Sequence, residues 1–486
     1  MNDEIYNLPK GWVRIRLDAF AEIILGQSPP SSTYNEDGNG LSFYQGKLEF
    51  GHMYPTPRKW CTSPKKIAEK GDVLISVRAP VGPTNICPER SCIGRGLAAI
   101  RGLAGVETHF ILYLMRAHEN LLSGIGTGTT FNAITGDKLK GIQVPLSPLP
   151  EQHRIIAKIE ELFTRLDAGV EALKKIKAQL KRYRQSVLKH AFEGKLTAEW
   201  RQAHKHELEP SSILLECIRE ERKKDLKRKY KELPPLDTSN MPELPDGWVW
   251  TRLLDVSEVV TGKTPSKTKI EYYGRDFCFY KPADLNNGYY VRESEDGLSR
   301  QGIVKSRLLP SKSTLVTCIG ATISKTGFIR KEGASNQQIN AIIPENQLTP
   351  ELIYFVCVSP QFQKSIIDNA SSTTLPILNK SRFEILPIPL MSILEQKEIV
   401  SEIERRFSVA DQIEKTVDQS LKQAERLRQS ILKRAFEGKL VPQDPNDEPA
   451  EKLLERIKEE RAKRLAEDHS RKKNRTRVTT KQTRLV

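Results

Sequence analysis

Arg184-Gln-Ser-Val-Leu-Lys-His-Ala-Phe-Glu-Gly-Lys-Leu196 returns later in the chain as Arg428-Gln-Ser-Ile-Leu-Lys-Arg-Ala-Phe-Glu-Gly-Lys-Leu440, with eleven of thirteen residues identical. The same offset aligns Glu151-Gln152 with Glu395-Gln396, and Gly11-Trp12 matches Gly247-Trp248 at a slightly shorter offset. The 486-residue chain is therefore an internal duplication, in which each copy has a globular part followed by a helical part. Two similar surfaces on one chain can engage a partner with two similar sites, and a double-helical polymer is such a partner.

Each globular part leads into a long amphipathic helix. The first helix opens at Pro150-Glu151, with proline in the first turn and an acid that suits the helix dipole. The second opens at Ser392, which forms a capping box with Glu395. Apolar residues then recur at steps of three and four until Gly194 and Gly438 end the helices. We predict two helices of about 43 to 45 residues, each about 65 Å long, that pair within the chain. A homodimerising coiled coil or a surface stripe is the alternative.

The predicted seam of the helix pair consists of Ile155, Ile159, Leu162, Leu166, Val170, Leu173, Ile176, Leu180, Tyr183 and Val187 in the first helix and Ile399, Ile403, Phe407, Ala410, Ile413, Val417, Leu421, Ala424, Leu427 and Ile431 in the second.

The globular parts mix strand and helix patterns. Matched β-type runs lie at Gly71–Arg78 and Ala98–Arg101 in the first part, and at Ser313–Gly320 and Ala341–Ile343 in the second. Helical stretches follow, at His109–Leu122 and Pro350–Ile367. We predict an α+β fold with two mixed α/β, strand-rich domains, separated by two long antiparallel coiled-coil helices in a pseudo-two-fold arrangement.

The predicted segments are a first globular domain at 1–150, a first long helix at 151–200, a charged amphipathic helix with a Pro-rich linker at 201–240, a second globular domain at 241–394, a second long helix at 395–440, an amphipathic extension at 441–468, and a basic tail at 469–486 that we expect to be disordered.

The formal charge of +16 does not by itself establish nucleic-acid binding. Residues 469–486 carry seven Lys or Arg and no acid, and residues 219–231 carry eight against three, so these two stretches supply most of the excess. The globular domains are nearly balanced, with 16 basic and 13 acidic residues in 1–150 and 17 and 15 in 241–394.

The chain lacks the sequence motifs of several other functional classes. The seven cysteines form no C-x-x-C pair, which favours reduced thiols and no metal site. There is no phosphate loop and no Asn/Asp-Pro-Pro-aromatic tetrapeptide of an amino-methyltransferase. The Glu-Gly-Lys of both repeats mimics half of a nuclease site, but glycine capping of a helix explains it better. No apolar run is long enough to span a membrane, so we expect a cytoplasmic protein. Because these catalytic motifs are absent from the sequence, we also expect the chain to be non-catalytic.

In its order of motifs the chain resembles the specificity (S) subunit of type I restriction-modification systems. These motifs are Leu-Pro-Lys-Gly-Trp12 and Leu-Pro-Asp-Gly-Trp248, Pro-Leu-x-x-x-x-Glu-Gln before each long helix, the Arg-Gln-Ser and Ala-Phe-Glu-Gly-Lys-Leu repeats that close each helix, and Leu-Leu-Glu-Arg-Ile-Lys-Glu-Glu-Arg461. The resemblance covers nearly the whole chain, and the joint order of the motifs is more specific than any one of them.

The resemblance implies that the globular domains are target recognition domains, each of which reads one half of a split site in double-stranded DNA. The long helices would space the two halves and dock two methyltransferase (M) subunits, with restriction-translocase (R) subunits joining the complex. S-adenosylmethionine, ATP and Mg²⁺ would belong to those partners, which direct adenine methylation and cleavage. The alternatives are a related system whose partner fuses methyltransferase and nuclease, and a coiled-coil scaffold that binds proteins and has no DNA role.

Base-reading residues are expected among Arg and Lys for guanine and Asn and Gln for adenine. The candidates for DNA contact are Gln45, Lys47, Arg78 and Arg95 in the first domain and Lys281, Asn286, Lys325, Asn336, Gln337, Gln338 and Asn340 in the second. The alternative roles are turn formation at Asn286 and a local amide network in the Asn-Gln run. The candidates for partner binding on the long helices are Lys174, Lys175, Arg184, Gln185, Phe192, Arg428, Gln429 and Phe436.

Overall fold

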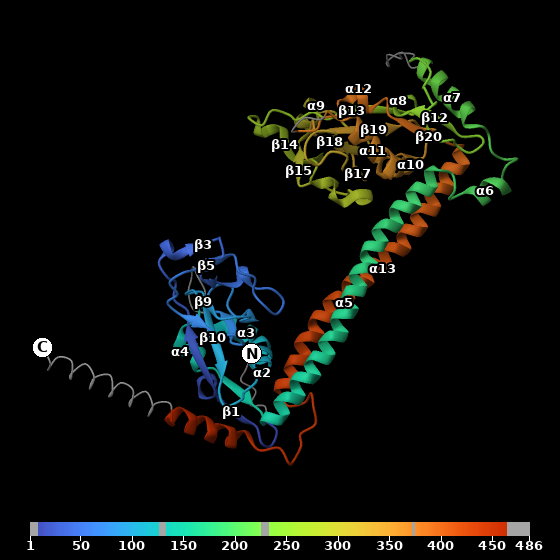
Figure 1. The fold of residues 1–486 in the computed structure, drawn as a ribbon. Coiled ribbons are helices and arrows are strands. Elements are labelled where there is room, and N and C mark those ends of the chain that lie inside the picture. The colour runs from blue at the N-terminus through green and yellow to red at the C-terminus, as the bar shows by residue number, and fades with distance from the viewer. Residues whose placement is uncertain (1–7, 126–132, 225–232, 372–374, 464–486) are drawn as a thin grey trace. The chain divides into compact units, whose positions relative to one another are not determined.

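The computed structural model describes residues 8–125, 133–224, 233–371 and 375–463, so the predicted basic tail lies outside the described residues (Figure 1). The chain divides into two compact units. Unit 1 comprises Met1–Leu173 and Gln419–Val486, and unit 2 comprises Lys174–Asp418. Each unit therefore contains one globular domain and part of both long helices.

The unit 1 domain is built from β1 (Val13–Arg16), α1 (Leu17–Phe20), β2 (Ala21–Leu25), β3 (Tyr34–Asn35), β4 (Leu41–Tyr44), β5 (Lys59–Cys61), β6 (Ile67–Ala68), β7 (Val73–Ser76), β8 (Thr84–Ile86), β9 (Ser91–Ile93), β10 (Leu97–Gly102), α2 (Thr108–Ala117), α3 (Glu119–Ile125), α4 (Gly136–Lys140) and β11 (Gln143–Leu146), with 3₁₀ turns η1 (Ser31–Thr33) and η2 (Lys47–Glu49).

The unit 2 domain is built from β12 (Val249–Arg252), α8 (Leu253–Val256), β13 (Ser257–Thr261), β14 (Tyr273–Tyr280), β15 (Asp296–Leu298), α9 (Arg300–Lys305), β16 (Thr314–Thr317), β17 (Thr326–Phe328), β18 (Gly333–Ser335), β19 (Ile339–Pro344), α10 (Pro350–Val358), α11 (Pro360–Asn369), α12 (Lys380–Phe383) and β20 (Pro387–Leu390), with 3₁₀ turns η3 (Ile270–Tyr272) and η4 (Asp284–Tyr290). Helices α5 (Leu149–Phe192), α6 (Ala198–Ala203), α7 (Ser211–Lys224) and α13 (Ile393–Phe436) complete the assigned elements, and residues 450–463 are also helical.

Both domains contain the same four-stranded antiparallel sheet. Its order is β2-β10-β7-β8 in unit 1 and β13-β19-β16-β17 in unit 2. The four matched β-type runs of the sequence form β7, β10, β16 and β19, so that prediction is confirmed. Every residue of β7 and β16 is buried, which agrees with their unbroken apolar and β-branched character.

A second sheet stands at the end of each domain away from its long helices (Figure 1). It has the order β3-β5-β4-β9-β6 in unit 1 and β15-β14-β18 in unit 2. Each sheet contains one parallel pair of strands: β4 with β9, and β14 with β18. The C-terminal ends of the two strands of each pair therefore lie together, and the loops that follow them meet.

The helical stretches expected after the sheets are present but broken. The first divides into α2 and α3 at His118, and the second into α10 and α11 at Ser359. In the second case Pro360 cannot continue the hydrogen-bonded turn, and the Ser359 hydroxyl accepts from the amide of Phe362 to start a new helix. The predicted continuous helices were wrong in this detail.

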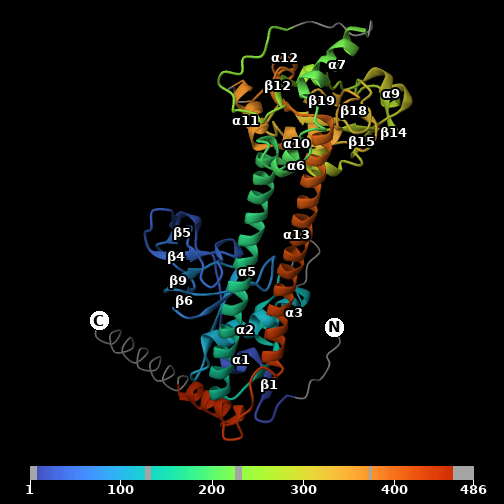
Figure 2. The same cartoon turned by 90° about the vertical axis from the view of Figure 1, so that its right-hand side faces the viewer.

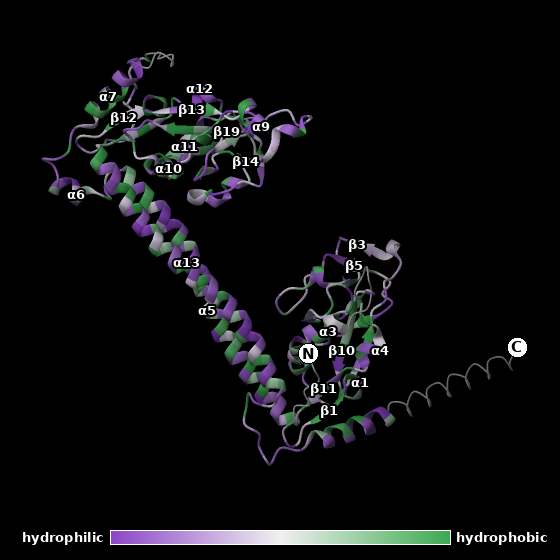
Figure 3. Ribbon diagram, turned by 180° about the vertical axis from the view of Figure 1, so that it is seen from behind, coloured by the Kyte–Doolittle hydropathy of each residue, from purple (hydrophilic) through white to green (hydrophobic). Residues whose placement is uncertain are grey.

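The two long helices have 44 residues each, as predicted. They pair in antiparallel register. In unit 2, Arg184 binds Asp411 at 2.6 Å and Lys177 binds Asp418 at 2.7 Å. In unit 1, Arg428 pairs with Asp167. The residue numbers of all three pairs add to the same value, as one antiparallel register requires. Figure 3 shows hydrophobic and hydrophilic residues interleaved along both helices, and Figure 2 shows each as a continuous rod.

A tryptophan joins each domain to the start of a long helix. Trp12 Nε1 donates to Glu151 Oε2 at 2.8 Å, and Trp248 Nε1 donates to Glu395 Oε2 at 2.7 Å. Both carboxylates are buried. These four residues are the Gly-Trp and Glu-Gln repeats of the sequence, so the duplicated motifs form duplicated joints.

The glycines that end the long helices contact the motif that begins the opposite repeat. Gly194 and Gly438 have φ of 71° and 69°, the left-handed conformation that favours glycine at a helix end. A Cβ on Gly194 would lie 2.1 Å from Pro245, and one on Gly438 would lie 2.2 Å from Pro9. The capping interpretation of Glu-Gly-Lys is thus confirmed, and glycine is also needed for this close approach.

Candidate nucleic-acid interface

Three loops meet beside the parallel strand pair of unit 1. The amide of Gly94, after β9, donates to the carbonyl of Tyr44 at the end of β4 at 2.8 Å. The amide of Val77, after β7, donates to the carbonyl of Gly96 at 2.9 Å. These bonds bring together the next residues along each strand, Gln45, Arg78 and Arg95. All three are exposed, and we call this cluster of three residues the first tip.

Unit 2 repeats the same backbone bonds. The amide of Asn336 donates to the carbonyl of Tyr280 at 3.2 Å, and the amide of Cys318 donates to the carbonyl of Gln338 at 2.7 Å. The residues that occupy the places of Gln45, Arg78 and Arg95 are therefore Lys281, Ile319 and Gln337, which we call the second tip. Two predicted candidates of each domain thus lie at equivalent positions. Arg78 and Lys325 both flank turns, but they are not equivalent.

The predicted lysines of unit 2 are tethered. Lys281 forms an ion pair with Asp296, and its amide donates to Asp284 Oδ2 at 2.7 Å. Lys325 Nζ donates to the carbonyl of Pro282 at 3.0 Å, which places it beside Lys281. Asn286 is exposed within η4.

The asparagines of the Asn-Gln run are structural. Asn340 is 3% exposed, and its Oδ1 accepts from Thr261 Oγ1 at 2.8 Å inside the sheet. Asn336 is 9% exposed, and its Nδ2 donates to Gln338 Oε1 at 2.9 Å. Burial leaves Asn340 no edge to offer a base, so we remove it from the candidates. Asn336 and Gln338 form the amide network that the sequence left as an alternative, whereas Gln337 is exposed.

In unit 1, Lys47 begins η2 close to Gln45 and is exposed. Its side chain, like those of Arg78 and Arg95, forms no ion pair with any residue in the described ranges. An unpaired, exposed cation is available to a phosphate or a base edge.

A basic cluster beside the second tip was missed from the sequence. It consists of the exposed residues Lys263, Lys267, Lys269, Lys305 and Arg307. The Ser306 hydroxyl donates to the carbonyl of Lys263 at 2.5 Å, which joins the two segments, and Thr264 Oγ1 donates to Gln337 Oε1 at 2.6 Å, which joins them to the tip. Three lysines between Gly262 and Ile270 with no acid among them were the available signal, concealed by the balanced charge of the whole domain.

The partner-binding candidates divide by burial. Phe192 and Phe436 are 4% and 6% exposed and belong to the cores of units 2 and 1, so they have no surface for a partner. Arg184 and Arg428 are used in the ion pairs between the long helices. Burial therefore speaks against partner contact by the two phenylalanines, whereas partner binding by the two arginines stays a prediction beside their structural role. The remaining candidates, Lys174, Lys175, Gln185 and Gln429, are exposed.

Part of the predicted helix seam faces outward instead of inward. In unit 2, Ile176, Tyr183 and Ile413 are 38%, 41% and 42% exposed, whereas Leu180, Ala410 and Val417 are buried. A pair of helices encloses only one narrow seam, so the apolar residues beside it stay in contact with solvent. These exposed apolar side chains make this part of the helix pair a candidate surface for a protein partner.

Among the described residues, no group of three or more His, Cys, Asp or Glu could hold a metal, and no helix is long and apolar enough to cross a membrane. All seven cysteines are free thiols.

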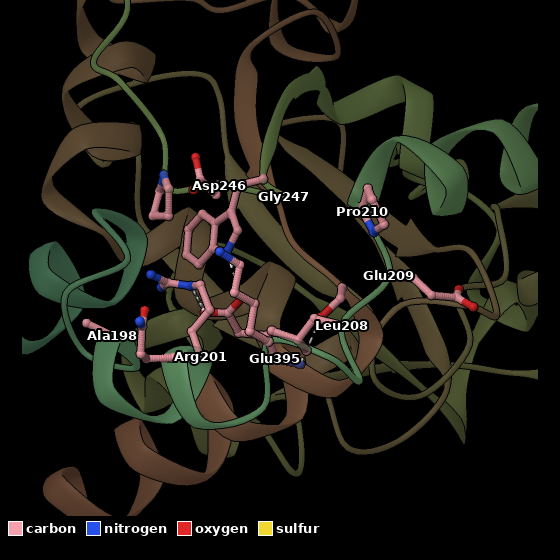
Figure 4. A pocket seen from close by; sticks show the side chains of 13 residues that line it. Ala198, Arg201, Leu208, Glu209, Pro210, Asp246, Gly247 and Glu395 are labelled. Atoms are coloured by element: carbon pink, nitrogen blue, oxygen red, sulfur yellow. Dashed lines mark hydrogen bonds and ion pairs between the residues drawn. The ribbon is translucent and has the colours of Figure 1, made fainter.

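A cavity of about 400 Å³ lies at the joint of α6 with the second domain (Figure 4). Its central charges are already satisfied, because Arg201 binds Glu395 at 2.8 Å and donates to the Gly194 carbonyl at 2.6 Å.

Comparison with known proteins agrees with this description. The family model described as type I restriction modification DNA specificity domain matches residues 9–182 and 245–423, once in each repeat. The EcoBI specificity subunit of Escherichia coli is 25% identical, with 96% of each chain covered. A putative type I restriction enzyme MjaX specificity subunit of Methanocaldococcus jannaschii is 39% identical over 40% of this chain and 45% of its own length.

Solved structures show the same fold. The HsdS subunit of Thermoanaerobacter tengcongensis has a TM-score of 0.52 at 19% identity, with 90% of this chain and all of that chain covered. A chain from a study of complex assembly in the type I restriction-modification system has a TM-score of 0.66, also at 19% identity, with 89% of this chain and all of that chain covered.

A strand-supported tip that recurs in each of the two repeats is the arrangement expected of a recognition protein. The chain belongs to the type I restriction-modification DNA specificity family. These matches favour DNA recognition over the interpretation as a protein-binding scaffold.

Proposed function

We propose that the chain recognises a bipartite site in double-stranded DNA, with the first tip reading one half and the second tip reading the other. The observation that carries this proposal is the repeated backbone at the two tips. Hydrogen bonds of 2.8 and 2.9 Å in unit 1 and of 3.2 and 2.7 Å in unit 2 present different side chains from one scaffold. A repeated scaffold that carries different side chains suits two half-sites of different sequence.

Phosphate contacts come from the cations that surround the tips. Lys47 serves the first tip, and the cluster of Lys263, Lys267, Lys269, Lys305 and Arg307 serves the second. In the described part of the chain, Lys263, Lys267 and Lys305 form no ion pair, so no internal acid competes with a phosphate for them. Contacts of this kind position a protein on a duplex without selecting its sequence.

The long helices dock two M subunits and set the distance between the half-sites, and R subunits join the complex for cleavage. The exposed Ile176, Tyr183 and Ile413 support a protein partner on this surface. The chain itself carries no cofactor. S-adenosylmethionine, ATP and Mg²⁺ belong to the partner subunits, which methylate adenine and cleave DNA. The complex acts in the cytoplasm.

Genome-wide mapping of methylated adenine tests the function directly. Cells that carry the genes for M and S should show one split motif, two short defined sequences separated by a gap of fixed length. Cells that carry M alone should lack that motif. An M preparation that methylates the same motif without this chain would show that the specificity lies elsewhere.

A further inference from the structure

The second sheet of each domain ends in the same tight turn. In unit 1 the amide of Leu97 donates to the carbonyl of Gly94 at 3.0 Å, and in unit 2 the amide of Ile339 donates to the carbonyl of Asn336 at 3.2 Å. Each bond closes a four-residue β-turn. Arg95 and Gln337 occupy its second position, the first corner of the turn, in the two domains.

Further bonds fix the equivalence of the two turns. The amides of Gly26 and Gly262, at the ends of β2 and β13, donate to the carbonyls of Leu97 and Ile339 at 2.9 and 3.0 Å. A side-chain hydroxyl also forms a hydrogen bond with each corner residue. Ser28 Oγ accepts from the Arg95 amide at 3.3 Å, and Thr264 Oγ1 donates to the Gln337 side chain at 2.6 Å.

The first turn presents a single side chain. Arg95 lies between Gly94 and Gly96, and a Cβ on Gly96 would be 2.1 Å from the carbonyl oxygen of Gln45. The guanidinium is exposed and has no hydrogen bond or ion pair with the residues that the structure describes. An unoccupied planar guanidinium can donate two parallel hydrogen bonds to one partner.

The second turn contains three side-chain amides, and one of them, that of Gln337, has an unused donor. Asn336 and Gln338 bind each other through the 2.9 Å amide bond and a 3.1 Å bond from the Gln338 amide to Asn336 Oδ1. Gln337 accepts from Thr264 through Oε1, and its amide nitrogen donates to no described residue. The amide oxygen keeps its second lone pair, so Gln337 can both donate and accept.

We propose that Arg95 and Gln337 are equivalent base-reading residues, and that Arg95 selects guanine in one half-site while Gln337 selects adenine in the other. Arginine donates two bonds to O6 and N7 of guanine. Glutamine donates to N7 of adenine and accepts from its N6 amino group. This inference rests on the proposed function, because it assigns the bases that the two tips read.

The test exchanges the two side chains one at a time in the full chain, as Arg95→Gln and Gln337→Arg, followed by mapping of methylated adenine in cells that carry the M partner. We expect Arg95→Gln to replace one guanine by adenine as the preferred base in one half of the motif, with the other half unchanged. Gln337→Arg should replace one adenine by guanine in the opposite half.

Arg95→Lys is the conservative control, because lysine keeps a donor for guanine without the planar fork. Purified complexes of M with each variant are also compared by competition binding of duplexes that differ at the affected base pair, which gives a result even for variants too weak to methylate. Loss of the native side chain should reduce the preference for the native base over its competitor by about 5- to 150-fold.

The outcomes separate the two proposals. If wild type yields no split motif, the proposed function fails. If wild type yields the motif but both exchanges leave its bases and the duplex discrimination unchanged, Arg95 and Gln337 do not read bases. Altered preference in both halves after a single exchange would overturn their assignment to separate half-sites.

Discussion

At the scale of single residues, the position of a cation matters more than the number of cations. The second domain has 17 basic and 15 acidic residues by sequence, yet Lys263, Lys267 and Lys305 stand together beside the second tip. The equivalent segment of the first domain, Gln27–Thr33, has no charged residue. The two segments correspond because Tyr34 and Tyr273 donate to the carbonyls of Pro29 and Pro265 at 2.7 and 2.8 Å.

We expect Lys263→Gln, Lys267→Gln and Lys305→Gln to weaken binding of all duplexes by similar factors, because a phosphate contact carries no sequence preference. Each lysine that contacts a phosphate should reduce the slope of log K against log salt by about 0.9. Fluorescence anisotropy of a labelled duplex at several salt concentrations measures this slope. Lys364→Gln, at an exposed position of α11, is the matched control and should leave it unchanged. A uniform slope across all four variants would argue against a phosphate role.

The Trp12–Glu151 joint gives a prediction with a pH dependence. Burial raises the pKa of Glu151, and the hydrogen bond from Trp12 partly opposes this by favouring the charged form. A raised pKa means that the folded state holds the proton more tightly than the unfolded state. The contribution of this carboxyl to the free energy of unfolding therefore falls as pH rises through its pKa. Trp12→Phe deletes the donor, so its cost should be about 1 to 3 kcal/mol near neutral pH.

The same substitution should cost less near pH 4, where the carboxyl is protonated in the folded state. Thermal unfolding of wild type and Trp12→Phe at both pH values measures the difference. Introducing Glu151→Gln into both proteins removes the titrating group, so the pH dependence of the loss should vanish. If it persists in that background, another group causes it.

At the scale of elements, the sequence predicted what periodicity and repetition determine. Both long helices, their glycine ends and the matched strands β7, β10, β16 and β19 follow from local patterns. The tips could not be predicted in detail, because they depend on which strand ends meet. The parallel pairing of β14 with β18 brings Lys281 beside Gln337, whereas the pairing of β19 with β13 and β16 places Asn340 inside the four-stranded sheet. The prediction from the sequence that Ile176 and Ile413 lie in the buried seam between the long helices was wrong. Both are exposed, because two helices cannot bury a wide apolar face.

Surface substitutions on the long helices should separate partner docking from folding. Lys175→Glu and Ile413→Ser change exposed side chains, so we expect weaker co-purification with M and an unchanged unfolding temperature. Arg184→Glu instead breaks the bonds to Asp411 and Glu414 and should lower the unfolding temperature. Full co-purification of the first two variants would place the M contact on another surface.

A matched deletion tests whether the helices set the gap between half-sites. Removing residues 168–174 from α5 and 421–427 from α13 takes one heptad from each helix. It leaves the Asp167–Arg428 and Lys177–Asp418 pairs on either side in their antiparallel register. About 10 Å of helix corresponds to roughly three base pairs. Methylation mapping should therefore show a shorter gap or no activity, whereas full activity at the original gap would mean that these helices are not the ruler.

At the scale of the whole molecule, duplication gives two domains with separate hydrophobic cores and separate tips. The core of unit 2 includes Trp248, Phe355 and Ile399, and the core of unit 1 includes Trp12, Phe110 and Ile155. No side chain of the first tip is needed to build the second. Each domain should therefore keep its specificity when the other is changed.

Exchange of the whole second domain is the strongest test of this independence. Residues 245–389 run from the proline beside Gly194 to Pro389, the next-to-last residue of β20, so replacing them with the matching segment of another specificity subunit keeps Glu395 and α13 intact. The donor segment must retain the Pro and Trp that form the joint. Methylation mapping should show one half-site of the donor, the original other half-site and an unchanged gap, because the helices are not altered. A motif that changed in both halves would mean that the two domains read DNA jointly.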